Sequence, residues 1–172
     1  VDLLKEISLH TVFTNKDRLV ELVEETKAGW DMDAFRRGHT IVMHRVLSYV
    51  SPVEAFCDAG ELSYYEFITD VASRVHTDAE AIGAKLAAVM KKIFTRSALT
   101  LEVMASRDDW QTAKNTVSSW ITALPQGEKL QGLCDFGLSR KNEGIMTSGT
   151  VQYVAKGGNF RSHGYDYDGS LM

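Results

Sequence analysis

The chain has 172 residues, of which 44% are hydrophobic and 24% are charged, and its formal net charge is −4. This length can bury a sizeable core, and the composition is that of an ordinary globular protein. Acidic residues outnumber basic ones on both sides of Arg96, so we expect neither nucleic acid nor a membrane as a partner. No apolar run approaches the ~18 residues of a membrane-spanning helix.

Residues 1–96 are predicted to be helical, in about six helices, because apolar residues recur at steps of three and four. One such stripe covers residues 32–50 and another covers residues 82–93. Five helix starts carry a hydroxyl side chain followed three residues later by a carboxylate, the arrangement in which each can bond the other's backbone amide. These pairs are Thr14 with Asp17, Ser51 with Glu54, Ser63 with Glu66, Thr77 with Glu80, and Ser106 with Asp109. The start at Ser51 is the best defined, since Pro52 takes the first helical position.

The pattern changes after residue 96. Leu99, Leu101 and Val103 alternate with other residues, which predicts a half-buried strand over residues 98–105. A helix with an apolar face is predicted next, over residues 110–124, and Pro125 stops it. A second strand is predicted over residues 146–155, ended by Gly157-Gly158 in positive-φ conformations.

We therefore predict an α+β protein with two parts. Residues 1–96 would form a helical connector, and residues 97–172 would form the first part of an α/β-layer domain, ordered strand–helix–strand. Two strands alone make a poor sheet, so this sheet is expected to be incomplete. The tail from Gly164 to Leu171 reads as the opening of a helix that the chain does not complete. We accordingly expect the chain to be a piece of a longer protein.

The sequence contains no recognisable catalytic or metal-binding pattern. His39 and His44 are five residues apart, whereas two zinc ligands on one helix need a spacing of four. His39 lies on an apolar stripe and is predicted to be a hydrogen-bonded core residue. Lys156-Gly-Gly-Asn159 lacks the Gly-Lys-Ser/Thr of a phosphate loop, and residues 166–169 lack the closing Glu of a calcium loop. We thus expect no catalytic, cofactor-binding or metal-binding residue in this chain.

Two further groups of residues have structural interpretations. Cys57 and Cys134 are predicted to be free, buried thiols, because two isolated cysteines without a Cys-x-x-Cys pair do not suggest a disulfide framework. Tyr64, Tyr65 and Phe67 lie among acidic neighbours, which argues against base stacking. This aromatic cluster is predicted to serve packing or to form a surface that contacts peptide.

Several of these segments together resemble a known family. The most distinctive block is Val151-Gln-Tyr-Val-Ala-Lys-Gly-Gly-Asn159 followed by Gly164-Tyr-x-Tyr-x-Gly-Ser-Leu171. Supporting it are Gly38-His39, Ser63-Tyr64-Tyr65-x-Phe67, and the run from Leu99 to Pro125. These features are similar to the second half of a pitrilysin/insulinase-type zinc metallopeptidase, of the presequence-protease and falcilysin subfamily.

The resemblance implies a function for the longer protein. Members of that family close two halves, joined by a helical hairpin, around an unfolded peptide. Their zinc is held in the first domain by an inverted His-x-x-Glu-His motif that this chain does not contain. The chain would then be a non-catalytic segment that supplies chamber wall and hinge-side helices. Its partners would be the remainder of the peptidase and unfolded oligopeptides, in a bacterial cytoplasm or an organelle matrix.

Two alternatives to this interpretation stay open. A stand-alone helical adaptor or regulatory module would explain the helical front half without any chemistry. An enzyme of unrecognised kind, complete within these residues, would need a catalytic group that no motif in the sequence supplies. In the main interpretation, by contrast, extended peptide could pair with a strand edge at residues 98–105 or 146–155.

Overall fold

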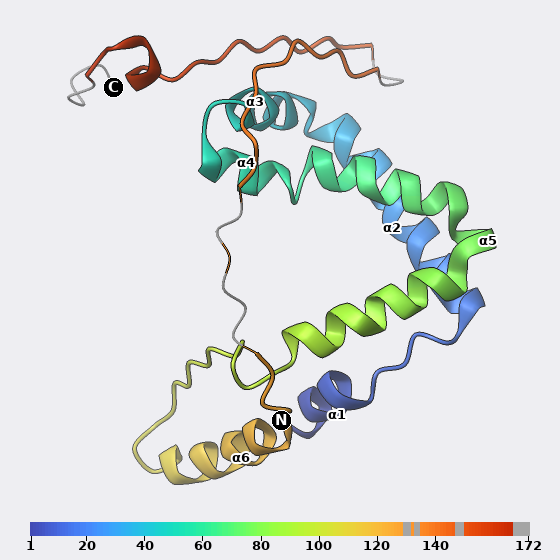
Figure 1. The fold of residues 1–172 in the computed structure, drawn as a ribbon, viewed down its shortest axis with the longest axis vertical. Helices are drawn as coiled ribbons and strands as arrows, with labels where there is room; N and C mark the ends of the chain where they lie inside the picture. The colour runs from blue at the N-terminus through green and yellow to red at the C-terminus, as the bar shows by residue number, and fades with distance from the viewer. Residues whose placement is uncertain (129–131, 133–134, 147–149, 167–172) are drawn as a thin grey trace. The chain divides into compact units, whose positions relative to one another are not determined.

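The computed structural model describes residues 1–128, 132, 135–146 and 150–166. Helices account for all the regular structure in these ranges (Figure 1). They are α1 (Asp2–His10), α2 (Lys16–Arg36), α3 (Gly38–Ser48), α4 (Pro52–Asp58), α5 (Leu62–Ile93), α6 (Trp110–Ala123) and the short 3-10 helix η1 (Arg161–His163). Within the described residues, no helix is long and apolar enough to cross a membrane.

The absence of strands in these ranges corrects the predicted fold class. Residues 99–105 have no regular structure, and neither do residues 150–159. Residues 147–149 of the second predicted strand lie outside the described part. Leu101, on the side expected to be buried, is 41% exposed, and Val154 of the second segment is 86% exposed, so period-two alternation here does not correspond to a buried face. A strand forms only where a neighbour accepts its backbone hydrogen bonds, and the described residues provide no such neighbour. The α+β prediction was therefore wrong.

The helical prediction for residues 1–96 is confirmed, but its helix starts were only partly right. Ser51 caps α4 as expected, with its hydroxyl accepting a hydrogen bond from the amide of Glu54 and with Pro52 opening the helix. The start of α2 is capped by Asn15, whose side chain accepts from the amide of Arg18 at 3.0 Å, and not by Thr14. Ser106 accepts from the amide of Asp109 at 3.1 Å, just before α6 begins.

The expected break at Thr77 does not occur, because α5 continues through it for 32 residues in total. Val71, Val75, Ala79 and Ile82 are all buried, and their spacing keeps one apolar side continuous through Thr77. A hydroxyl followed by a carboxylate is also compatible with a helix interior. Burial of the apolar side therefore outweighed the capping pattern, and about six predicted helices became five before Arg96.

Contacts divide the chain into two compact units, each built from two stretches of sequence. Unit 1 comprises Val1–Val20 and Val75–Leu133, and unit 2 comprises Glu21–Arg74 and Cys134–Met172. The division falls inside α2 and inside α5, so both helices contribute to both units. The proposed boundary near residue 96 stays a prediction.

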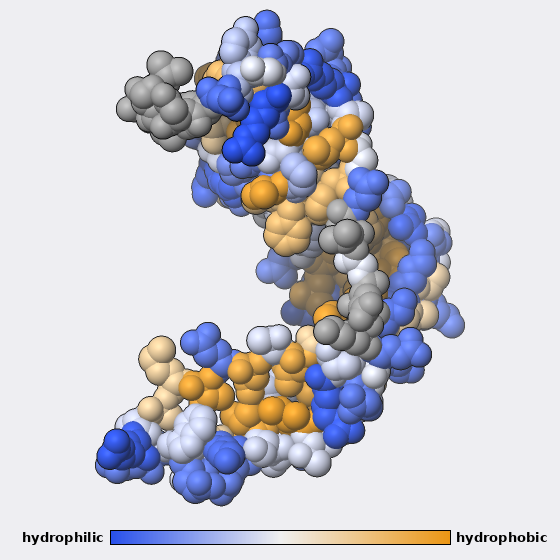
Figure 2. Space-filling model, turned by 60° about the vertical axis from the view of Figure 1, so that its left-hand side comes forward, coloured by the Kyte–Doolittle hydropathy of each residue, from blue (hydrophilic) through white to orange (hydrophobic). Residues whose placement is uncertain are grey.

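Unit 1 is organised around the packing of α1 against α6. Trp120 of α6 is 7% exposed, and its indole nitrogen donates a hydrogen bond of 2.9 Å to the hydroxyl of Ser8 in α1. Leu124, which follows the last residue of α6, is also buried in this core and is 2% exposed. Part of the surface remains apolar: Leu3, Leu4 and Ile7 of α1 and Val89 and Ile93 of α5 are exposed, and Figure 2 shows apolar residues gathered over this unit.

Gly83 marks the place in unit 1 where α5 meets the connection between α1 and α2. A Cβ atom on Gly83 would lie 2.4 Å from the carbonyl oxygen of Phe13, which is backbone and cannot easily move. We expect Gly83→Ala to lower the free energy of unfolding by about 1–3 kcal/mol through overpacking. Gly29, also helical, has no atom within 4 Å of such a Cβ. Gly29→Ala is the matched control and should stabilise by about 1 kcal/mol; urea unfolding would measure both. Equal effects of the two substitutions would contradict the close approach.

Unit 2 is built on the packing of α3 against α4, with Ile41, Leu62 and Ile68 in its core. The segment at residues 150–160 runs along α3. The ring of Tyr153 lies 3.0 Å from the position that a Cβ atom on Gly38 would take. The side chain of Val46 lies 3.2 Å from the position that a Cβ atom on Gly157 would take. The side-chain amide of Asn159 donates to the carbonyl of Val50 at 3.3 Å. These contacts hold an irregular segment against a regular helix.

Three smaller predictions were also wrong, one of them only in part. His39 is exposed and not in the core; its ring lies 5.8 Å from that of Tyr153. Cys57 is free as predicted, but it is exposed; Cys134 lies outside the described residues. Positive φ angles among the described glycines occur at Gly127, Gly137 and Gly164, and not at Gly157-Gly158. The predicted helix opening of the tail lies largely outside the described residues.

Candidate functional site

The strongest concentration of charge in unit 2 surrounds Arg45 on α3. Its guanidinium bonds the Asp58 carboxylate at 2.7 Å, the Glu143 carboxylate at 2.8 Å and the Ser63 hydroxyl at 3.0 Å. Glu66 lies 3.7 Å away. The Arg45 side chain is 12% exposed and that of Asp58 is 5% exposed. Arg45 therefore ties α3 to the end of α4, to the start of α5 and to the segment at residues 140–145.

The ionisation of these groups follows from their contacts. The hydrogen bond from Arg45 is the main cause that holds the pKa of Glu143 below its usual range. The hydrogen bond to Glu143 likewise raises the pKa of Arg45. The hydroxyl of Tyr49 donates a hydrogen bond to Glu143, and the pKa of Tyr49 is raised, first by burial and then by this hydrogen bond. All three groups thus keep their ordinary charge at neutral pH.

The interaction of Arg45 with Glu143 predicts a pH-dependent contact. The folded-state pKa of Glu143 is lower than its ordinary 4.5, so its stabilising contribution is present above about pH 4.5 and disappears as the pH falls through the lowered folded value. We expect the carboxyl carbon of Glu143, followed by NMR, to titrate below 4.5. In the Arg45→Met variant the midpoint should move upward. An unchanged midpoint would show that Arg45 does not hold this carboxylate.

Two further ion-pair clusters connect the helices of unit 2. Glu61, between α4 and α5, accepts from Arg37 at 2.9 Å and contacts the ring nitrogen Nδ1 of His44 at 2.7 Å. On the other side, Asp31 of α2 accepts from the Tyr65 hydroxyl and from Lys27, both at 2.7 Å. Hydrogen bonds from Lys27 and then Tyr65 lower the pKa of Asp31.

The predicted aromatic cluster packs in the same region. The ring of Tyr64 lies 5.5 Å from Trp30 of α2 and 6.1 Å from Phe67. Together with the bond between Tyr65 and Asp31, these contacts fix α5 on α2. Of the two roles left open for the cluster, the structure supports packing for Tyr64 and Tyr65, while Phe67 is 57% exposed.

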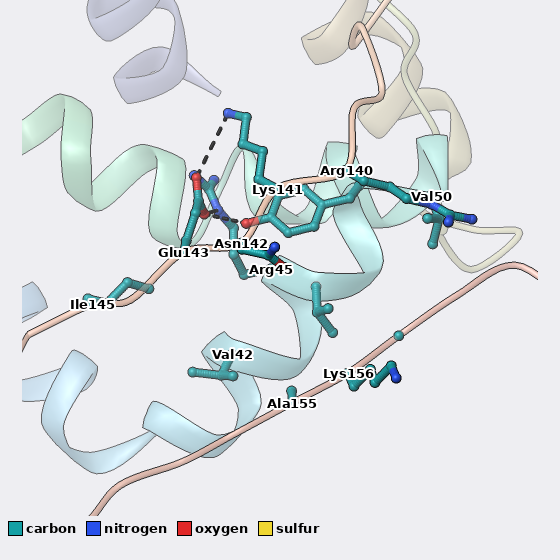
Figure 3. A pocket seen from close by; sticks show the side chains of 13 residues that line it. Val42, Arg45, Val50, Arg140, Lys141, Asn142, Glu143, Ile145, Ala155 and Lys156 are labelled. Atoms are coloured by element: carbon teal, nitrogen blue, oxygen red, sulfur yellow. Dashed lines mark hydrogen bonds and ion pairs between the residues drawn. The ribbon is translucent and has the colours of Figure 1, made fainter.

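A cavity of about 480 Å³ lies beside the Arg45 cluster, between α3 and two segments of the C-terminal region (Figure 3). Its wall on α3 carries Val42, Arg45, Val46, Tyr49 and Val50. The opposite walls carry Arg140, Lys141, Asn142, Glu143, Ile145, Ala155, Lys156 and Gly157. This size is within the usual range for ligand pockets, and the lining combines apolar side chains with several cations.

The histidines lie in separate places. His10 contacts Glu6 at 2.8 Å, His44 contacts Glu61, and Nε2 of His163 lies 3.1 Å from the Arg140 guanidinium. Across the described ranges, no group of three or more His, Cys, Asp and Glu side chains could hold a metal ion. The arrangement around Arg45 fixes the extended segment at residues 140–145 against α3.

Motif reasoning did not identify Arg45, Asp58 or Glu143. Arg45 and Glu143 are 98 residues apart, and no local spacing relates them. One signal was available: Arg45 lies within the apolar stripe of residues 32–50, where a charged residue needs a buried partner.

Residues 1–71 match the family described as associated with peptidases of family M16, subfamily C. Over 99% of its length the chain is 31% identical to protein HypA of Clostridium perfringens, and over 98% it is 28% identical to presequence protease 1, chloroplastic/mitochondrial, of Arabidopsis thaliana. It spans 18% and 15% of the length of these two relatives. No solved structure matches it significantly. The matched region and these two relatives together support the resemblance of the chain to a segment of M16-type peptidases.

Proposed function

We propose that the chain is a non-catalytic part of a zinc-dependent peptidase that degrades unfolded peptides. The observation that carries this proposal is the alignment of 98% of the chain with presequence protease 1. The match of residues 1–71 to the peptidase-associated family supports it independently. Zinc would be bound in another domain of the longer protein, by residues that this chain does not include.

The helices of this chain would form part of the wall of a closing chamber, with hinge-side helices beside it. Two features support this role. The helix α5 has 32 residues and takes part in both compact units, as a mechanical connection requires. The charged residues around Arg45 and Glu61 pair with one another, which suits a rigid support. The partners would be the rest of the peptidase and unfolded oligopeptides, in a bacterial cytoplasm or an organelle matrix.

The test compares the longer protein with the 172-residue chain alone. The longer protein should hydrolyse an unstructured peptide, lose activity with a metal chelator and regain it with zinc. The chain alone should neither hydrolyse the peptide nor hold zinc at one ion per chain. In the longer protein, Arg45→Met should reduce hydrolysis without changing the zinc content, whereas the exposed Arg36→Met should change neither.

Each contrary result favours a different alternative. Tightly bound zinc or turnover in the chain alone would indicate a complete enzyme. A longer protein that hydrolyses no peptide would support the adaptor or regulatory module instead.

A further inference from the structure

One row of apolar residues runs along the part of α5 that belongs to unit 1. Its members follow one another at alternating steps of four and three: Val75, Ala79, Ile82, Leu86, Val89 and Ile93. The first three are buried, whereas the last three are 36%, 51% and 54% exposed. The described residues therefore cover this row as far as Ile82 and leave its second half open to solvent.

The spacing of the row indicates which kind of element fits on its exposed half. Alternating steps of four and three produce the narrow seam along which two helices pack, each side chain of one helix inserting between those of the other. A helix that lies in a membrane surface presents a broader apolar side. Leu86, Val89 and Ile93 thus suit the apolar seam of a second helix.

The charges beside the row indicate the polarity of that second helix. Lys85 and Lys92 directly precede Leu86 and Ile93, so both lysines lie along the same edge of the row. Both are exposed, and neither makes a hydrogen bond or an ion pair among the residues that the structure describes. Since residues at such edges form ion pairs between packed helices, the second helix is expected to carry carboxylates along the facing edge.

A second copy of this chain would not supply those carboxylates. In an antiparallel pair of α5 helices the two lysine edges face each other, which brings like charges together. In a parallel pair each lysine edge faces the opposite edge of the row, where Gly83 and Met90 lie. The relatives offer another source, because the matched region is only 18% and 15% of their length.

We propose that the exposed row of Leu86, Val89 and Ile93 is the docking surface for an acidic amphipathic helix from the remainder of the longer protein, with Lys85 and Lys92 paired to its carboxylates. This proposal rests on the proposed function in one respect, that the chain is part of a longer polypeptide. The spacing and the charges are independent of peptide hydrolysis. Docking joins the end of α5 to another part of the peptidase.

Carbodiimide cross-linking of the longer protein tests the charge pairing, because this reagent joins a lysine directly to a carboxylate that it contacts. Mass spectrometry of the digested protein identifies the linked residues. Lys85 or Lys92 should be joined to a Glu or Asp outside the 172 residues. Lys91, which is exposed on the side of α5 away from the row, is the matched control and should give no such link.

Thiol labelling of the longer protein tests whether the row is covered. Val89→Cys should react with a maleimide at least about tenfold more slowly than Lys91→Cys, because a covered side chain reacts only through local opening. Combining Lys85→Glu with Lys92→Glu should raise the rate at Val89→Cys, whereas Lys91→Glu should not. Peptide mapping separates these thiols from the native, exposed Cys57, and circular dichroism checks that each variant is folded.

Four results would overturn the docking surface or its occupant. Equal labelling of Val89→Cys and Lys91→Cys would show that the row is open in the longer protein. The absence of links from Lys85 and Lys92 would remove the acidic helix. Links that join isotopically labelled to unlabelled copies would assign the row to a dimer instead. Protection of Val89→Cys only with phosphatidylserine vesicles would assign it to a membrane. Because none of these measurements uses hydrolysis, they can succeed or fail separately from the peptidase test.

Discussion

Replacing Arg45 with methionine is expected to lower the free energy of unfolding by about 3–5 kcal/mol, the cost of leaving a buried carboxylate without its cation. Asp58 is 3% exposed, and one of its carboxylate oxygens, Oδ2, accepts from Arg45 and from Ser63. The other, Oδ1, is buried and has no hydrogen-bond partner, so Arg45 supplies most of the compensation. Methionine preserves the volume of the aliphatic part and removes the charge. Urea unfolding followed by circular dichroism measures the loss.

Two companion variants separate charge from volume. Arg36→Met makes the same substitution at an exposed position on α2 and should change stability by less than about 0.5 kcal/mol. Adding Asp58→Asn to Arg45→Met should restore part of the loss, since the buried group is then neutral. If Arg45→Met is as harmless as Arg36→Met, the Arg45 cluster does not stabilise unit 2.

Replacing Trp120 with alanine is expected to cost unit 1 about 3–5 kcal/mol, the usual range for removing a buried large aromatic side chain. Trp120 is 7% exposed and also donates to Ser8 on α1. The substitution thus opens a cavity between α1 and α6 and removes a hydrogen bond between them. Thermal unfolding followed by circular dichroism would report the effect.

Trp110 provides a matched control on the same helix, because it is 48% exposed. Trp110→Ala should cost about 1 kcal/mol or less. Trp120→Phe keeps most of the apolar volume and should cost about 1 kcal/mol for the lost hydrogen bond. Similar losses for Trp110→Ala and Trp120→Ala would contradict the central place of Trp120.

The helices were predictable from the sequence because their signals are local. Ser51-Pro52 at the start of α4 and the apolar spacing of α5 depend on neighbours within four residues. The predicted strands failed for a non-local reason. Alternation at Leu99, Leu101 and Val103 describes which residues could share a face, but a strand also needs a hydrogen-bonding neighbour that the alternation does not specify.

The site was less predictable than the fold. Arg45 and Glu143 meet because the segment at residues 140–145 returns to α3, and sequence spacing carries no information on that return. His39 was misplaced for a related reason: helical periodicity gave it a side of α3, but whether that side is covered depends on residues more than a hundred positions later, such as Tyr153.

The way in which the two units share the chain has a consequence for synthesis on the ribosome. Unit 1 needs Ser8 and Trp120 together, and unit 2 needs Arg45 and Glu143 together. A nascent polypeptide that has emerged only as far as α5 can therefore complete neither unit. We expect its early helices to expose Ile41 and Val75 to chaperones until the later residues leave the exit tunnel.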